Sequence, residues 1–97
     1  MILTGLANED FISFMCKTYP NIRWHDYENM TDSMINALII EWFDSVGIYI
    51  AVEPQIDFKN VCYDVSINFK LHSVWGSRLQ ATNEAIAKAN EIYNTSN

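Results

Sequence analysis

The chain has 97 residues, with 12 acidic and 6 basic side chains, and carries a formal net charge of −6 at neutral pH. Apolar residues make up 49% of the chain, which excludes a disordered or low-complexity protein and predicts a single domain over residues 1–97. No apolar run approaches the ~18 residues of a membrane-spanning helix, so no membrane contact is expected. Two cysteines are too few for a disulfide framework, which favours a reducing, cytoplasmic location.

Two helices are predicted in the first half of the chain. Asn8 is a suitable N-cap, followed by acidic residues in the first turn, and the helix it begins ends at Pro20. Residues 21–30 show no periodicity and are predicted to form a loop. Thr31 is predicted to cap a second helix, which carries a broad apolar stripe and ends at Gly47.

After Gly47 the apolar period changes from 3.6 residues to two, which predicts β-strands over residues 48–58 and 61–71. Folding the chain at Lys59-Asn60 places Ile48 opposite Leu71 and pairs apolar residues along one face. In this register Tyr49 lies beside Lys70 on the exposed face. Pro54 then falls opposite Val65. It has no N–H to donate, so we expect a four-residue loop over Phe58–Val61 or a bulge at Pro54. The first strand is then expected at an edge, and any third strand beside the second.

The last third of the chain is predicted to end in a helix. Residues 73–77 form a turn, and residues 78–81 are either a short third strand or the start of that helix. Thr82 is the expected N-cap, and residues 94–97 are expected to fray. The predicted fold is therefore an α+β two-layer sandwich, in the order ααββ(β)α, with an antiparallel hairpin of two or three strands packed on three helices.

The acidic charge is concentrated in residues 24–58, which contain seven acidic side chains and no Lys or Arg. This segment either forms a solvated face or binds a basic protein surface. Two aromatic residues of the segment, on a loop and on the exposed strand face, are of the kind enriched at interfaces, whereas Trp24 and Trp75 can instead fold back onto the core. The candidate partner-binding residues are Asp26, Tyr27, Glu28, Asp32, Glu41, Asp44, Tyr49, Glu53 and Asp57.

The sequence offers no pattern that is typical of catalysis. His25-Asp26 could serve as a base and its orienting group, with Cys62 or Ser66 as the nucleophile, but a polar loop pair is the simpler interpretation. The His and Cys residues are not spaced as metal ligands, and the three glycines are isolated. We therefore expect a non-enzymatic protein with no cofactor, no metal and no direct contact with nucleic acid.

Three segments resemble the "phage ABA sandwich" domain of small bacteriophage proteins. They are Tyr27–Phe43 for its first helix, Tyr63–Leu71 for a hairpin strand, and Ala81–Asn90 for its last helix, so the resemblance spans residues 27–93. It implies a phage or mobile-element origin, and hence the host cell cytoplasm. It carries over no site residues. Small acidic phage proteins include inhibitors of host defence nucleases, the anti-CRISPR proteins among them, and a similar role is implied here by analogy.

Three functions remain open at this point. The first is an inhibitor or adaptor that presents acidic side chains to a basic groove, such as the nucleic-acid channel of a nuclease. The second is an immunity protein that blocks a basic toxin by the same physics. The third is a structural subunit that self-associates, as a homodimer or larger, through an open sheet face or the strand edge at Pro54.

Overall fold

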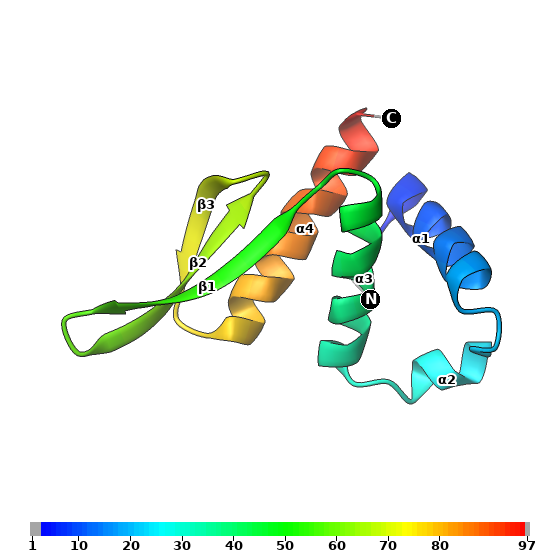
Figure 1. Cartoon of the computed structure of the whole chain (residues 1–97), viewed down its shortest axis with the longest axis horizontal. Helices are drawn as coiled ribbons and strands as arrows, with labels where there is room; N and C mark the ends of the chain where they lie inside the picture. Colours follow the sequence, from blue (N-terminus) through cyan, green and yellow to red (C-terminus); the bar gives the residue numbers. More distant parts are fainter. Residues whose placement is uncertain (1–2, 97) are drawn as a thin grey trace.

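The computed structural model describes residues 3–96, apart from the side chains of Trp24, His25 and Asp57. These residues form four helices and one antiparallel sheet with the strand order β1-β2-β3 (Figure 1), which confirms the predicted α+β class. In chain order the elements are α1 (Gly5–Thr18), α2 (Trp24–Glu28), α3 (Asp32–Ser45), β1 (Ile50–Asp57), β2 (Asn60–Ile67), β3 (Lys70–Trp75) and α4 (Arg78–Ser96).

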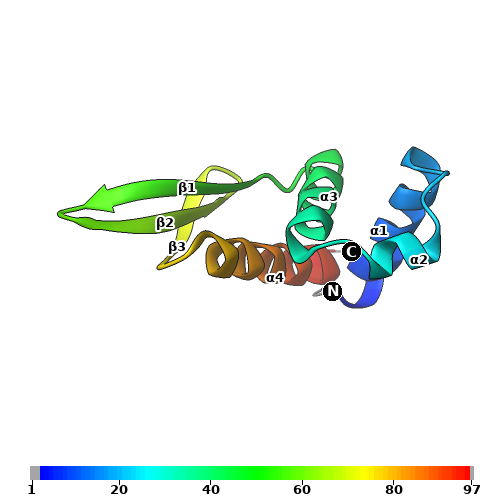
Figure 2. The same cartoon turned by 90° about the horizontal axis from the view of Figure 1, so that it is seen from below.

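Helix α4 lies along one face of the sheet and contacts all three strands, whereas no helix within residues 3–96 covers the opposite face (Figure 2). Helix α3 also contacts β1, whereas α1 packs on α4 and α3. Helix α4 lies between the sheet and the other helices, and it is buried on both of these sides. Its buried residues Ala81, Ala85, Ile86 and Ala89 are mostly small and allow close approach of both layers.

The main hydrophobic core lies where α1, α3 and α4 meet. Trp42 of α3 is its centre: its ring lies 6.0 Å from Phe11 of α1, 4.7 Å from Phe43 and 4.9 Å from Tyr93 of α4. Val65 and Ile67 of β2 extend the core under the sheet. The core is therefore built around one end of the sheet rather than under its whole length.

Helix α1 begins at Gly5, with Thr4 as its N-cap, and not after Asn8 as predicted. The helix can begin earlier because α4 supplies partners for its first amide groups. Asn94 Oδ1 accepts a hydrogen bond from the Ala7 N–H at 2.8 Å, and Asn90 Oδ1 accepts one from Thr4 at 2.9 Å. The local sequence of α1 does not predict this capping, because the capping side chains belong to a distant helix.

Helix α2 corrects the prediction of a loop over residues 21–30. Its start is stabilised by Asp26, whose Oδ2 accepts a hydrogen bond from the Arg23 N–H at 2.7 Å. The prediction for α3 is confirmed at both ends. Thr31 Oγ1 accepts a hydrogen bond from Met34 N–H at 3.2 Å, and Gly47 adopts a φ of +82° after the helix.

The β1–β2 hairpin is present, but its predicted register is wrong by two residues. Ile50 pairs with Ile67 and Asp57 with Asn60, so the loop is Phe58-Lys59, and Pro54 lies opposite Tyr63 instead of Val65. The pair that closes the two-residue loop, Asp57/Asn60, is hydrogen-bonded, and every second pair after it is bonded as well. Pro54 and Tyr63 form one of the pairs in between, so the Pro54 nitrogen points away from β2. The expectation that β1 is an edge strand and that the third strand pairs beside β2 is confirmed.

The second predicted strand is divided by a tight turn at Asn68-Phe69. Both residues have positive φ, +52° and +69°, as in a type I′ turn, and the chain returns as β3. The predicted turn over residues 73–77 is therefore partly strand. The register of this turn places Leu71 beside Ser66, on the face away from α4, and a bulge opposite Val65/Ser66 then leaves His72 without a partner residue.

Helix α4 begins at Arg78, so residues 78–81 are helical and do not form a third strand. Its N-cap is Ser77, and not Thr82 as predicted. Ser77 Oγ accepts a hydrogen bond from the Gln80 N–H at 3.2 Å. The helix continues to Ser96, so residues 94–96, where fraying is predicted, are helical in the structure. Asn94 is held by α1, which explains why the last turn stays helical. Residue 97 lies outside the described residues.

Residues 55–62 form an arm that extends beyond the rest of the fold (Figures 1 and 2). Pairing with β3 ends where Trp75 meets Tyr63, and α4 begins three residues later, beside the Tyr63 ring. The arm is therefore a two-stranded ribbon, and its apolar residues are exposed: Ile56 by 78%, Phe58 by 94% and Val61 by 50%.

Candidate protein-binding surface

The sheet face opposite α4, here called the open face, is the largest surface of the sheet that no helix covers. Strand alternation and the β2–β3 register place both polar and apolar side chains on it. Its residues are Ala51, Glu53, Gln55, Cys62, Asp64, Ser66, Leu71 and Val74. Leu71 and Val74 are more than half exposed. Large apolar groups beside carboxylates are a composition that suits binding to another protein.

Two carboxylates face each other directly across this surface. Glu53 of β1 pairs with Asp64 of β2, and neither makes an ion pair within the part of the chain that the structure describes. Like charges placed directly opposite in a sheet are destabilising, because their side chains lie about 5 Å apart. A basic group from another molecule would relieve this repulsion.

An aromatic corner borders the carboxylate pair. Tyr49 and Asn68 are joined twice: the Tyr49 N–H donates to Asn68 Oδ1 at 2.8 Å, and the Asn68 N–H donates to the Tyr49 carbonyl at 2.8 Å. This fixes the Tyr49 ring 5.8 Å from the Phe69 ring. Tyr49 is 46% exposed as predicted, but it lies beside Asn68 rather than Lys70. A shallow hollow of about 310 Å³ lies between the corner and Glu53.

Sequence reasoning found Tyr49 and Glu53 but missed Asp64, Phe69, Leu71 and Val74 as members of one surface. Strand parity predicts that Asp64 is exposed, but nothing in the sequence selects it as a binding residue. Leu71 and Phe69 were assigned to the buried face, because nothing in the pair Asn68-Phe69 resembles the usual Asn-Gly turn signal. The two-residue turn at Asn68-Phe69 reverses the side on which Leu71 lies, and the bulge at His72 then places Val74 on the same side.

The other predicted acidic residues do not gather with Glu53. Asp26 and Glu28 lie on α2, at the opposite end of the molecule from the arm (Figure 1), and Asp32 begins α3. Asp57 ends β1 at the arm's turn, and its side chain lies outside the described residues, as do those of Trp24 and His25. The nine predicted residues therefore form several separate patches rather than one binding site.

Glu41 and Asp44 lie on the outward side of α3, but Glu41 is engaged within the fold. Both of its carboxylate oxygens accept a hydrogen bond from the Tyr19 hydroxyl, at 2.9 and 2.8 Å. This contact raises the pKa of Tyr19 above its ordinary value, and it ties the C-terminal end of α1 to α3. Glu41 is thus positioned to stabilise helix packing, whereas Asp44 remains exposed.

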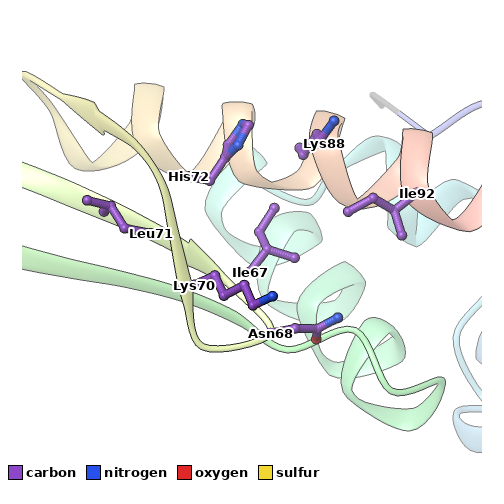
Figure 3. Close-up of a pocket in the computed structure, with 7 residues that line it drawn as sticks. All are labelled: Ile67, Asn68, Lys70, Leu71, His72, Lys88 and Ile92. Atoms are coloured by element: carbon purple, nitrogen blue, oxygen red, sulfur yellow. The ribbon is translucent and has the colours of Figure 1, made fainter.

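A basic hollow lies on the other side of the sheet, between the start of β3 and α4 (Figure 3). It has a volume of about 330 Å³, and Lys70, His72 and Lys88 line it together with apolar residues. Lys88 Nζ lies 3.6 Å from a Glu91 oxygen, which offsets part of its charge. The basic residues of this acidic chain are thus separated from the carboxylates of the open face.

An apolar groove of about 420 Å³ lies between α1, α2 and α3, here called the α1–α3 groove. Its walls are Phe11, Ile12, Met15, Ile22, Tyr27 and Ile35, and two further lining residues, Cys16 and Glu28, are exposed. Burial is the main cause that raises the pKa of Tyr27, with smaller contributions from Cys16 and Asp26. Tyr27 is therefore half-buried in the groove and does not lie with the acidic residues of the open face.

Residues 3–96 include no helix with the length and hydropathy needed to cross a membrane. Across the same residues, no three His, Cys, Asp or Glu side chains gather as metal ligands. Comparison with protein-family models, curated proteins and solved structures finds no match to this chain.

Proposed function

We propose that this chain is a non-enzymatic binding protein whose open face engages a basic protein surface and blocks it. The observation that carries the proposal is the direct pairing of Glu53 with Asp64 on a sheet face that no helix covers. An Arg or Lys side chain placed between these carboxylates would make charge-assisted hydrogen bonds and remove their repulsion. The exposed Tyr49, Leu71 and Val74 would supply apolar contact area around this centre.

The class of partner that fits best is a nuclease of the host cell. Carboxylates on a sheet can occupy a groove that otherwise binds phosphates, because both groups present oxygen acceptors to Arg and Lys. The resemblance to small phage proteins and the net charge of −6 support this choice. A basic toxin is the alternative partner, in which case the chain is an immunity protein.

The face is favoured over the β1 edge as the contact surface. At the edge, the Pro54 nitrogen points outward and offers no N–H, so an incoming strand would lose a hydrogen bond there. The central location of Pro54 in β1 limits continuous pairing to short stretches on either side. Contact through side chains on the open face avoids this loss.

The test compares two variants with equal change in charge. Glu53→Gln with Asp64→Asn neutralises the open face. Glu9→Gln with Asp44→Asn neutralises two exposed carboxylates on α1 and α3. Each variant is immobilised and exposed to lysate of the source cell, and retained proteins are identified by mass spectrometry. We expect partners that the wild type and the α1/α3 variant retain, that the open-face variant loses, and that high salt releases.

The retained protein is then purified and assayed. Competition by double-stranded DNA and inhibition of nuclease activity would support the proposed class of partner. Equal retention by both variants would contradict the role of the open face. A retained toxin rather than a nuclease would instead support the immunity function.

A further inference from the structure

We propose that two copies of this chain associate by placing the arm of each copy in the α1–α3 groove of the other. The arm, residues 55–62, ends in the loop Phe58-Lys59. The groove lies at the far end of the same molecule. The inference concerns surfaces separate from the open face and does not depend on the proposed function.

The arm shows the features of a segment that is covered in the assembled protein. A two-stranded ribbon is marginally stable in water unless its apolar face packs against something. Here neither β3 nor α4 extends beyond Tyr63, and Ile56, Phe58 and Val61 are at least half exposed. Such a contiguous apolar patch at the end of a projecting ribbon is typical of a contact site.

The backbone conformation of Phe58 also indicates that the arm is a contact site. Its φ is +54°, a left-handed value that costs a residue with a Cβ about 1 kcal/mol or more. The fold keeps a large apolar side chain where glycine or asparagine would be easier, and exposes 94% of it to solvent. Such strain is found at sites where a side chain is presented for binding.

The groove has the size and chemistry to receive the arm. Its volume of about 420 Å³ lies within the range of pockets that enclose a small ligand, and its walls are mostly apolar. Glu28, an exposed acidic residue, lines it. Next to Phe58 the arm carries Lys59, the one basic residue between Arg23 and Lys70. Asp57 on the other side of Phe58 balances the charge of Lys59 in the sequence, so the match rests on the apolar tip and the apolar groove, with Lys59 able to approach Glu28.

The dimensions require that the groove belongs to a second copy. The molecule is 46 Å long, and the arm and α2 lie at its two ends in both views (Figures 1 and 2). The arm therefore cannot reach its own groove. In the proposed assembly, two copies in antiparallel orientation each place an arm in the groove of the other, which closes a symmetric dimer. Two arms with three large apolar residues each bury on the order of 1,000 Å², the lower range for a specific interface.

The first test is the mass of the wild-type chain in solution by light scattering, from micromolar to millimolar concentration. We expect a concentration-dependent dimer of twice 11.2 kDa that persists at high salt. Phe58→Gly should reduce dimer affinity by at least tenfold and leave the fold as stable as before or more so, because glycine relieves the positive φ. Phe69→Gly is the matched control. It changes an equally exposed Phe at positive φ in the other hairpin, and it should leave the dimer intact.

A second test locates the contact. In an Asn60→Cys, Cys62→Ser variant, the new thiol lies beside the arm tip and can meet Cys16 of the groove in the second copy. Mild oxidation should give a covalent dimer, and a further Cys16→Ser change should abolish it. A wild type that stays at 11.2 kDa up to millimolar concentration overturns the proposal. So does a dimer that survives Phe58→Gly, or a cross-link that does not need Cys16. The open-face variants should dimerise normally, which separates this proposal from the proposed function.

Discussion

Asn94 in the last turn of α4 accepts a hydrogen bond from the backbone N–H of Ala7 in the first turn of α1, at a distance of 2.8 Å. The amide group of Asn94 also donates to the Thr4 carbonyl at 2.9 Å. One side chain thus satisfies backbone groups of a helix that lies 87 residues away in the sequence. The two ends of the described chain are held together by this contact.

Replacing Asn94 by alanine should therefore destabilise the whole domain. The Ala7 N–H and the Thr4 carbonyl would each lose a partner, which predicts a loss of about 1–3 kcal/mol in the free energy of unfolding. Urea denaturation followed by circular dichroism measures it. Thr95→Ala is the control, because the Thr95 hydroxyl binds only carbonyls of its own helix, those of Glu91 and Ile92. A loss for Asn94→Ala no larger than for the control would contradict this role.

Asn8 distinguishes the helix start seen in the structure from the one suggested by the sequence. Its Oδ1 is buried without a hydrogen-bond partner among the described residues, inside α1 rather than at its N-cap. Asn8→Ala should stabilise the protein by about 0.5–1 kcal/mol, since alanine favours a helix interior and leaves no unsatisfied oxygen. If Asn8 were the N-cap, the same change would cost about 1 kcal/mol. The sign of the shift in the urea midpoint decides between the two.

Two tyrosine hydroxyl groups that donate hydrogen bonds to carboxylates predict a loss of stability in alkaline solution. The Tyr93 hydroxyl donates to Asp10, which raises the pKa of Tyr93 above 10.0, and burial adds to the effect. Glu41 raises the pKa of Tyr19 in the same way. The folded state therefore holds these protons more tightly than the unfolded state. Their contribution is fully present below pH 10.0 and is lost as the pH rises through the folded-state values.

The measurement is the free energy of unfolding at a series of pH values across and above 10.0. A Tyr19→Phe, Tyr93→Phe variant should start less stable and lose less stability with rising pH than the wild type. Parallel curves for the two proteins would show that these tyrosines do not carry the pH dependence.

The Asn68-Phe69 turn predicts a variant in which stability and binding change in opposite directions. Both residues have positive φ, and Phe69→Gly would create the preferred Asn-Gly pair of a type I′ turn. We expect a gain of about 0.5–1 kcal/mol in stability. The variant also removes the ring beside Tyr49 on the open face, so binding to the basic partner should weaken. Phe58→Gly, which relieves a positive φ in the other hairpin and leaves the Tyr49 and Phe69 rings in place, is the control.

The hairpin shows what periodicity can and cannot determine. The predicted and observed registers differ by two residues, and both place apolar side chains opposite each other on the same face. Ile50 meets Ile67 in the structure, for example. A shift of one would have mixed the faces, but a shift of two preserves their character. Only the loop geometry and the turn at Asn68-Phe69 distinguish the two registers.

The sequence by itself determined the α+β class, the single N-cap at Thr31, the terminator at Gly47, the edge location of β1 and the excess of acidic charge in residues 24–58. All of these depend on local chemistry or on parity. The tertiary structure decided the start of α1, the split of the second strand, the pairing of Glu53 with Asp64 and the exposure of the arm. These depend on contacts between residues far apart in the chain, such as Ala7 with Asn94, or on which packed elements reach a given strand. A pattern read along one segment does not contain that information.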